Sequence, residues 1–218
     1  MKIFKIIAVA GAIFLANPRA RANYGESYKK LDEKNRAVLD KANLYFDSIV
    51  SFSGNFLQFN NADGSLSEGV VYIQKPDKIR FEYTNPFRIL FLKNGGIINY
   101  YDIDLDELAV IPQKISPIFE LLSKQDNLEK LDSEIISVVP DGDKNVTINT
   151  RLKLGDNIIG ICYIFNGEIT RLAGLTIDGG EALELSFFND KINSPLDKKI
   201  FIFDNPRLFN NRKKLRNK

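Results

Sequence analysis

Two-residue turn signals recur along most of this chain, and they constrain its fold more than any other feature of the sequence. Aspartate or asparagine followed by glycine is the dipeptide that tight β-hairpin turns prefer. Between these signals, from Phe52 onward, runs rich in β-branched and aromatic side chains alternate apolar with polar residues. Strands joined by tight turns predict an antiparallel meander. The turn signals are Asp63-Gly64, Asn94-Gly95, Asp141-Gly142, Asn166-Gly167 and Asp178-Gly179, with a weaker one at Gly155-Asp156. The predicted strands are Phe52–Phe59, Val70–Gln74, Ile79–Thr84, Ile89–Leu92, Ile97–Ile103, Ile135–Val139, Val146–Leu152, Ile158–Phe165, Ile169–Leu175, Leu183–Phe188 and Ile200–Phe203.

Two segments have helical patterns instead. Tyr24–Val50 places apolar side chains at steps of three and four, and a stripe of this kind must lie on an apolar surface. Ser116–Lys124 begins with a residue suited to capping and continues with proline at the first helical position. Two architectures satisfy these patterns. One is an α+β domain with helices on one face of a sheet, and the other is a strongly curved sheet whose helices close over its concave side.

The first 22 residues have the features of a secretory signal peptide. Lys2 and Lys5 precede the apolar run Ile6–Ala16, and Ala20-Arg21-Ala22 supplies a cleavage site of the A-x-A type. The apolar run is shorter than the ~20 residues that a membrane-spanning helix needs. We therefore expect export and cleavage near Ala22. Cleavage removes four basic residues and no acid, which changes the formal charge from +2 to −2.

The mature chain is predicted to form a single domain over residues 23–211, followed by a basic tail over residues 212–218. Five of the seven tail residues are lysine or arginine, in RKKLRNK. Such a tail can contact phospholipid head groups, or it can simply remain solvated. The sequence indicates no nucleic-acid footprint.

Several classes of chemistry are excluded by composition. The chain has no histidine, which rules out Ser-His-Asp and Cys-His catalysis and histidine metal sites. Its single cysteine, Cys162, lies in an apolar run and is interpreted as a structural thiol. The acidic run Asp102–Glu107 lacks the glycine and the final acid of a calcium loop, so it is interpreted as a turn. The sequence therefore predicts no catalytic residue, metal or cofactor.

An apolar surplus remains to be explained. The chain has 16 phenylalanines and 8 tyrosines, and Arg88–Leu92 (RILFL) is apolar on both faces of a strand. Both faces of that strand should then be shielded from water. Helices over the concave side of a curved sheet would shield one of them and create an apolar cavity, the usual form of a small-molecule or lipid site.

Five stretches, in this order and spacing, resemble the outer-membrane lipoprotein carrier family of periplasmic chaperones. They are SFSGNFLQF (Ser51–Phe59), KPDKIRFEYTNP (Lys75–Pro86), FRILFLKNGGIINYYD (Phe87–Asp102), SPIFELL (Ser116–Leu122) and FIFDNPR (Phe201–Arg207). The resemblance implies a mainly β (α+β) fold, an incomplete, strongly curved antiparallel β-barrel whose helices form a lid over an apolar cavity. It implies a monomeric, non-enzymatic periplasmic protein without a cofactor. The implied partners are triacylated lipoproteins, the inner-membrane ABC transporter that releases them, and an outer-membrane acceptor or the outer membrane itself.

The resemblance also implies roles for particular residues. The lid of the family is held by an arginine at the position of Lys75, and lysine cannot make the planar fork of hydrogen bonds that arginine makes. Tryptophans frequent in the family are replaced here, for example by Phe81 and Asn99. We expect the walls of the acyl-chain cavity to come from the strands and its cover from the helices. The wall residues are Phe56, Ile79, Phe81, Tyr83, Leu90, Leu92 and Ile98, and the cover residues are Leu39, Tyr45, Ile49, Ile118, Leu121 and Leu122.

Two other functions stay open at this stage. The same cavity would suit a lipocalin-like binder of small apolar ligands or free lipids, which needs no partner protein. An exported hydrolase that uses two carboxylates needs no histidine, although no motif in the sequence supports it.

Overall fold

The computed structural model describes residues 32–112, 128, 133–141, 145–154, 157–178 and 182–204. The expected signal peptide, the expected helix Ser116–Lys124 and the basic tail lie outside the described residues. Within them, no helix is long and apolar enough to cross a membrane.

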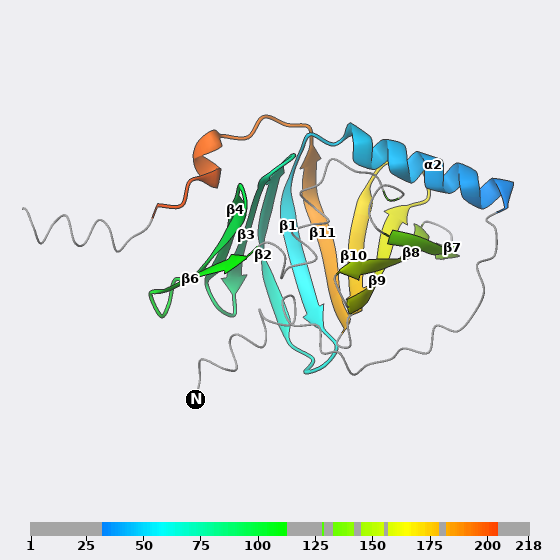
Figure 1. The fold of residues 1–218 in the computed structure, drawn as a ribbon. Coiled ribbons are helices and arrows are strands. Elements are labelled where there is room, and N and C mark those ends of the chain that lie inside the picture. The colour runs from blue at the N-terminus through cyan, green and yellow to red at the C-terminus, as the bar shows by residue number, and fades with distance from the viewer. Residues whose placement is uncertain are drawn as a thin grey trace, which may run out of the picture.

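The fold is mainly β, with eleven strands in one antiparallel sheet that does not close (Figure 1). The chain starts in the middle of the sheet, at β1, and proceeds strand by strand to one edge at β6. It resumes at the opposite edge, at β7, and returns to the middle, where β11 pairs with β1. The strands are β1 (Ser51–Asn60), β2 (Leu66–Gln74), β3 (Lys78–Asn85), β4 (Ile89–Asn94), β5 (Ile97–Asp102), β6 (Glu107–Pro112), β7 (Ser133–Asp141), β8 (Asn145–Leu154), β9 (Asn157–Asn166), β10 (Leu172–Asp178) and β11 (Ala182–Ile192).

Ten of the eleven predicted strands are present, with shifted ends, and the incomplete antiparallel barrel is confirmed. The prediction of a strand at Ile200–Phe203 is wrong, because Lys198–Phe201 forms the 3-10 helix η2. The side chain of Asp197 caps it by accepting a hydrogen bond from the backbone N–H of Lys199, 2.9 Å away. A further strand, β6, lies at the edge of the sheet and was not predicted.

The expected N-terminal helix is present as α2 (Glu33–Ser48). Asp32 is its N-cap, since its carboxylate accepts a hydrogen bond of 2.7 Å from the N–H of Asn35. The helix runs across one end of the sheet over β10, β9 and β8 (Figure 1). Its buried side includes Leu39, Ala42 and Tyr45, which is the stripe that the spacing predicts.

The two faces of the sheet carry separate apolar clusters. The larger one, here called the inner cluster, joins the side chains of α2 to one face of the sheet. It extends across the sheet, from β5 near one edge to β7 at the other. A smaller one, the outer cluster, packs Leu90, Leu92 and Tyr101 against Phe201 of η2. α2 and η2 therefore lie on opposite faces of the sheet, and β4 is buried between η2 and the side chains of the inner cluster.

Candidate functional site

The candidate site is the inner face of the sheet together with the helix that lies on it. Two neighbouring aromatic residues of α2 make the contact. The ring of Tyr45 meets Phe165 edge-on at 5.4 Å between centroids, and the ring of Phe46 meets Tyr163 at 5.6 Å. Edge-to-face pairs of this kind stabilise beyond the apolar area they bury. The helix is thus fixed to β9 by a small aromatic group rather than by the backbone.

One hydrogen bond anchors the helix to the sheet from within this group. The hydroxyl of Tyr45 accepts a bond of 3.1 Å from the backbone N–H of Leu172, the first residue of β10. Burial raises the pKa of Tyr45, although the bond from Leu172 opposes that rise. The tyrosine therefore stays neutral at physiological pH and holds the start of β10 beneath the helix.

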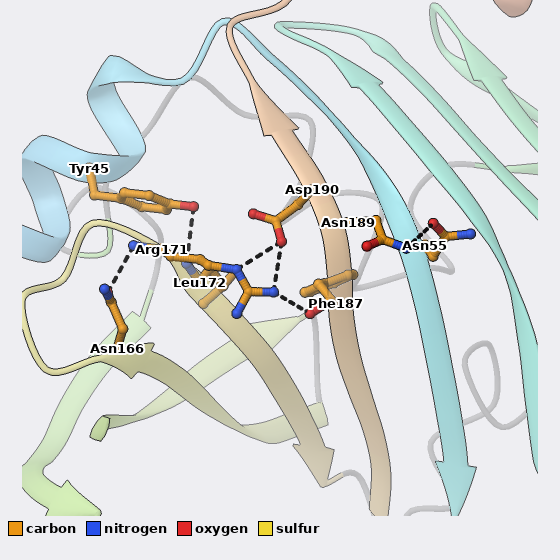
Figure 2. A network of polar contacts seen from close by, with 8 residues as sticks. All are labelled: Tyr45, Asn55, Asn166, Arg171, Leu172, Phe187, Asn189 and Asp190. Atoms are coloured by element: carbon orange, nitrogen blue, oxygen red, sulfur yellow. Dashed lines mark hydrogen bonds and ion pairs between the residues drawn. The ribbon is translucent and has the colours of Figure 1, made fainter. Parts of the chain in front are cut away.

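A polar network next to this bond fixes the segment that carries Leu172 (Figure 2). The guanidinium of Arg171 pairs with the carboxylate of Asp190 on β11 at 2.7 Å and also donates to the carbonyl oxygen of Phe187. The side-chain oxygen of Asn166 accepts a bond of 2.9 Å from the N–H of Arg171. The turn between β9 and β10 is thus held to β11. The residue after Arg171, Leu172, is thereby placed to donate its hydrogen bond to Tyr45.

The C-terminal end of α2 is held by two residues from distant parts of the chain. The ammonium of Lys75, which follows β2, donates a hydrogen bond of 2.7 Å to the carbonyl oxygen of Phe46. The side-chain amide of Asn193, which follows β11, donates a bond of 2.9 Å to the carbonyl oxygen of Ser48. The last turn of the helix has no basic residue of its own. Lys75 supplies the positive charge that a helix C-terminus favours, and both residues satisfy carbonyls that the helix leaves open.

Most of the expected cavity residues lie together. Eight of them belong to the inner cluster and are buried. They are the expected wall residues other than Leu90 and Leu92, and the cover residues that the structure describes. The residues are Leu39, Tyr45, Ile49, Phe56, Ile79, Phe81, Tyr83 and Ile98. The other three, Ile118, Leu121 and Leu122, lie outside the described residues. Whether the eight line a cavity for acyl chains stays a prediction.

Leu90 and Leu92 do not share a face with the others, which corrects the expectation that they do. Cross-strand neighbours point to the same side of a sheet, and these two residues pair with Glu82 and Arg80 rather than with Phe81. They belong to the outer cluster with Phe201. The expected parity of β4 was off by one residue, and such a slip turns every side chain of a strand to the other face.

Several residues of the inner face were missed by the sequence analysis. Phe91 occupies the place expected for Leu90 and Leu92, and its ring meets Tyr83 and Tyr100. On the other half of the sheet, Tyr163 and Phe165 lie directly under α2. No alternation in the sequence marks them, because the run from Ile158 to Phe165 is apolar at nearly every position. Only the structure shows that Ile159, Ile161, Tyr163 and Phe165 are buried together.

The inner face also carries a few polar groups. The hydroxyl of Tyr83 donates to the side-chain oxygen of Gln58 at 2.8 Å, and burial raises the pKa of Tyr83. The fully buried side chain of Lys93 reaches the carboxylate of Asp77 at 2.6 Å, in the turn that follows Lys75. The backbone N–H of Leu128 donates a bond of 3.0 Å to the side chain of Asn43 in α2. The helix therefore also holds one residue of the segment between β6 and β7.

An open groove of about 540 Å³ lies beside α2. Its walls come from the helix, from the turn between β9 and β10 and from the end of β11. The lining residues are Lys41, Leu44, Tyr45, Ser48, Glu168, Ile169, Thr170 and Ile192. Among the residues that the structure describes, no group of three or more acidic or cysteine side chains could hold a metal ion.

The chain is similar to several known proteins. The family model described as "Outer membrane lipoprotein carrier protein LolA" matches residues 47–204. An outer-membrane lipoprotein carrier protein of Methylococcus capsulatus is 29% identical over 172 residues, which cover 74% of this chain and 81% of that protein. The carrier protein of Pseudoalteromonas translucida is 26% identical over 166 residues, covering 73% and 79%. An uncharacterized protein of Rickettsia prowazekii is 28% identical over 185 residues, 80% of each chain. Among solved structures, a LolA superfamily protein of Nitrosomonas europaea matches with a TM-score of 0.46 and 13% identity over 78% of this chain and 98% of that one.

Proposed function

Because this chain belongs to the LolA family of outer membrane lipoprotein carrier proteins, we propose that it carries lipoproteins from the inner to the outer membrane. It binds their acyl chains on the inner face of the sheet. One observation carries this proposal. The part of the aromatic inner face on β8, β9 and β10 is covered by α2 (Figure 1), and a hydrogen bond from a distant residue, Lys75, holds the end of that helix.

The energetic need for such a carrier is large. Three acyl chains of about 15 methylenes each amount to roughly 35 kcal/mol of unfavourable contact with water, at about 0.8 kcal/mol per methylene. A bilayer offers the same chains about the same gain, so a carrier must bind them less tightly than a membrane does. Loading then needs external work, and unloading proceeds spontaneously at the destination.

A cover that opens satisfies both requirements, and α2 has the contacts expected of one. It rests on the sheet through side chains, and its C-terminal end is held by single hydrogen bonds from Lys75 and Asn193. These bonds break without disturbing any strand pairing. When the helix moves away, the rings of Tyr163 and Phe165 become available to acyl chains; when it returns, the chains are expelled.

The proposed cycle uses no catalysis. The precursor is exported, its signal peptide is cleaved near Ala22, and the mature protein works in the periplasm. It receives triacylated lipoproteins from an inner-membrane ABC transporter and passes them to an outer-membrane acceptor or to the outer membrane itself. No cofactor takes part.

The test is to isolate the mature protein from the periplasm of its own organism and to identify what it holds. Triacylated lipoproteins in the purified complex are the expected result. Lys75→Leu serves as the comparison, because it removes the hydrogen bond to the carbonyl oxygen of Phe46 that holds the cover closed. This variant should hold more lipoprotein.

Two outcomes contradict the proposal. Free lipids or small apolar molecules, without lipoproteins, indicate a lipocalin-like binder instead. A protein that carries nothing and does not extract lipoproteins from inner-membrane vesicles in a reconstituted assay with the transporter is no carrier.

A further inference from the structure

One polar atom on the inner face has no partner within the fold. The hydroxyl of Tyr163 is buried and makes no hydrogen bond to any described residue. The whole side chain is 1% exposed. Buried polar groups in proteins are hydrogen-bonded with few exceptions, and each exception calls for an explanation.

The other two tyrosines buried in the inner cluster have partners there. Tyr45 accepts a bond from the N–H of Leu172, and Tyr83 donates one to Gln58. Thr150, on the neighbouring strand β8, directs its own hydroxyl to the carbonyl oxygen of Ile161 at 3.3 Å. Burial raises the pKa of Tyr163; Thr150 lies close enough to oppose that rise but is not in hydrogen-bond geometry with it. The phenol is neutral and has a proton to donate.

Apart from Thr150, the described neighbours of Tyr163 are apolar. Its cross-strand neighbours are Leu175 on β10 and Ile148 on β8, both fully buried. The ring of Phe46 covers it from α2, edge-on at 5.6 Å. Phe46 is the residue whose carbonyl oxygen accepts the bond from Lys75. The ring that carries the hydroxyl thus lies beneath the part of the helix that Lys75 holds, and movement of that part uncovers it.

We propose that the hydroxyl of Tyr163 is a binding site for the carbonyl oxygen of an esterified or amide-linked acyl chain. The inference rests on the proposed function and specifies the chemistry of its cargo. With α2 displaced, acyl chains lie on the aromatic inner face, and one acyl carbonyl oxygen accepts a hydrogen bond from the hydroxyl of Tyr163. The fold leaves this donor unpaired because the cargo supplies the acceptor.

The same environment selects against free fatty acids. A carboxylate on the inner face beside Tyr163 would lose its hydration and gain one hydrogen bond from a neutral donor. No cation is described among the neighbours of Tyr163 named above. Burying an ion without a partner is far more costly than burying a neutral carbonyl. The site therefore distinguishes acylated glycerol or an acylated amine from the free acid, although all of them carry the same hydrocarbon.

The experiment compares two synthetic lipopeptides that differ only in their carbonyls. One carries a dipalmitoyl-glyceryl group on its cysteine, and the other carries the dihexadecyl ether of the same glycerol. The full-length mature protein should bind the ester about fivefold more tightly than the ether, the size expected of one neutral hydrogen bond. Tyr163→Phe should abolish this preference while the binding of the ether stays unchanged.

A matched control and a second measurement separate a binding role from a structural one. Tyr101→Phe removes a hydroxyl from the outer cluster, where it donates to Asp106 at 2.8 Å. It should lower the urea midpoint and leave the ester preference intact. Tyr163→Phe should keep or raise the urea midpoint, because it removes a buried donor that has no partner.

The outcomes are distinct from those of the proposed function. An ester preference that survives Tyr163→Phe, or a fall of the urea midpoint in that variant equal to that of Tyr101→Phe, overturns the inference and leaves the carrier function standing. Failure of the native protein to bind either lipopeptide overturns both.

Discussion

The ammonium of Lys75 lies 2.7 Å from the carbonyl oxygen of Phe46, so a residue that follows β2 closes the last turn of α2. The backbone N–H of Lys75 also donates a bond of 2.9 Å to the carbonyl oxygen of Val50, just beyond the helix. The backbone bond sets the place of the residue, and the side-chain bond holds the helix. A substitution of Lys75 therefore removes the side-chain bond to Phe46 and keeps the backbone bond to Val50.

Lys75→Leu should therefore slow the release of cargo. This variant lacks the hydrogen bond from Lys75 to the carbonyl oxygen of Phe46, here called the latch. The closed, empty form then loses a charge-assisted hydrogen bond of about 1–2 kcal/mol and the open, loaded form loses nothing, so cargo is retained roughly tenfold longer. The measurement is the rate of lipoprotein transfer to acceptor vesicles in a reconstituted assay. Hydrogen exchange at the end of α2 should become faster in parallel.

Two controls accompany this variant. Lys75→Arg keeps a donor and should restore most of the native rate. Lys78→Leu removes a half-buried cation of the same hairpin, at the start of β3, without touching the helix bond. Transfer and exchange in Lys75→Leu that equal those of Lys78→Leu would contradict the role of a latch.

The ion pair between Lys93 and Asp77 should respond asymmetrically to mutation. The side chain of Lys93 is fully buried, whereas that of Asp77 is 57% exposed. Asp77→Ala leaves a buried ammonium with only a carbonyl oxygen as partner, at 3.2 Å. Lys93→Met removes the charge and keeps an apolar stem in the same space. Removal of one partner of a buried pair is costly, while replacement of the buried charge by an apolar group is close to neutral.

We expect Asp77→Ala to lower the free energy of unfolding by about 2 kcal/mol, and Lys93→Met by less than about 1 kcal/mol. Urea unfolding measures both. The double variant should be more stable than Asp77→Ala alone, because no unpaired charge remains. Equal losses of unfolding free energy in the two single variants would contradict this prediction. They would mean that only the lost attraction between the two charges matters, and that the unpaired buried ammonium adds no cost.

Gly69 should not tolerate a side chain. A Cβ atom at this position would lie 2.1 Å from the carbonyl oxygen of Glu82 and 2.9 Å from the ring of Phe56. The first contact is with backbone, so it is relieved only by separating β2 from β3. Gly69→Ala should lower the free energy of unfolding by more than about 3 kcal/mol, which is in the range of severe overpacking.

Gly96 offers the matched control for that experiment. It has open space around its Cα, with no atom within 4 Å of an added Cβ. Gly96→Ala should change the stability by less than about 1 kcal/mol, and in the stabilising direction if the unfolded chain loses freedom. Similar thermal midpoints for the two variants would contradict the close approach of β2 and β3.

The strands could be predicted because their signals are local. Turn dipeptides and alternation are properties of neighbouring residues, and they placed ten strands correctly. The pairing of β1 with β11, in which Phe56 lies opposite Phe187, joins residues that are far apart in the chain. No local pattern specifies such a pair, and the architecture followed from the resemblance to a family rather than from periodicity.

The face of β4 could not be predicted for a physical reason. Its residues from Ile89 to Lys93 are all buried, since η2 covers one side and the inner cluster the other. A strand buried on both sides has no alternation to set its parity. The same ambiguity affects Ile200–Phe203, where a short apolar run forms η2 instead of a strand.

The candidate site was predicted unevenly. The contact between Lys75 and α2 gives the expected latch residue a definite partner, although its role in hand-over stays a prediction. Tyr163 was missed because its strand has apolar residues on both faces, so the sequence does not show which face is buried. That run was interpreted only as the surroundings of Cys162. The side chain of Cys162 in fact lies half-buried on the other face of β9. Which tyrosine lacks a partner depends on every neighbour in space, and no sequence pattern reports that.

The protein should lose stability at alkaline pH through its buried tyrosines. Burial is the main cause that raises the pKa of Tyr100 to about 12, and the nearby charges of Asp102 and Glu107 add to it. Burial also raises the pKa of Tyr83 and of Tyr163. In the unfolded chain a tyrosine ionises near pH 10. Above that pH the unfolded chain releases protons that the folded protein keeps, so the free energy of unfolding falls as pH rises.

This contribution is complete below about pH 10 and is lost progressively as the pH rises toward and beyond about 12. Urea unfolding at a series of pH values measures the slope, and tyrosinate absorbance shows which state ionises. Tyr100→Phe should make the loss shallower above about pH 10 and leave the stability near neutral pH almost unchanged, because the ring and its contact with Phe91 remain. An identical alkaline slope in the native protein and in Tyr100→Phe would mean that Tyr100 ionises as readily in the fold as in water, and that its side of the sheet is open to solvent.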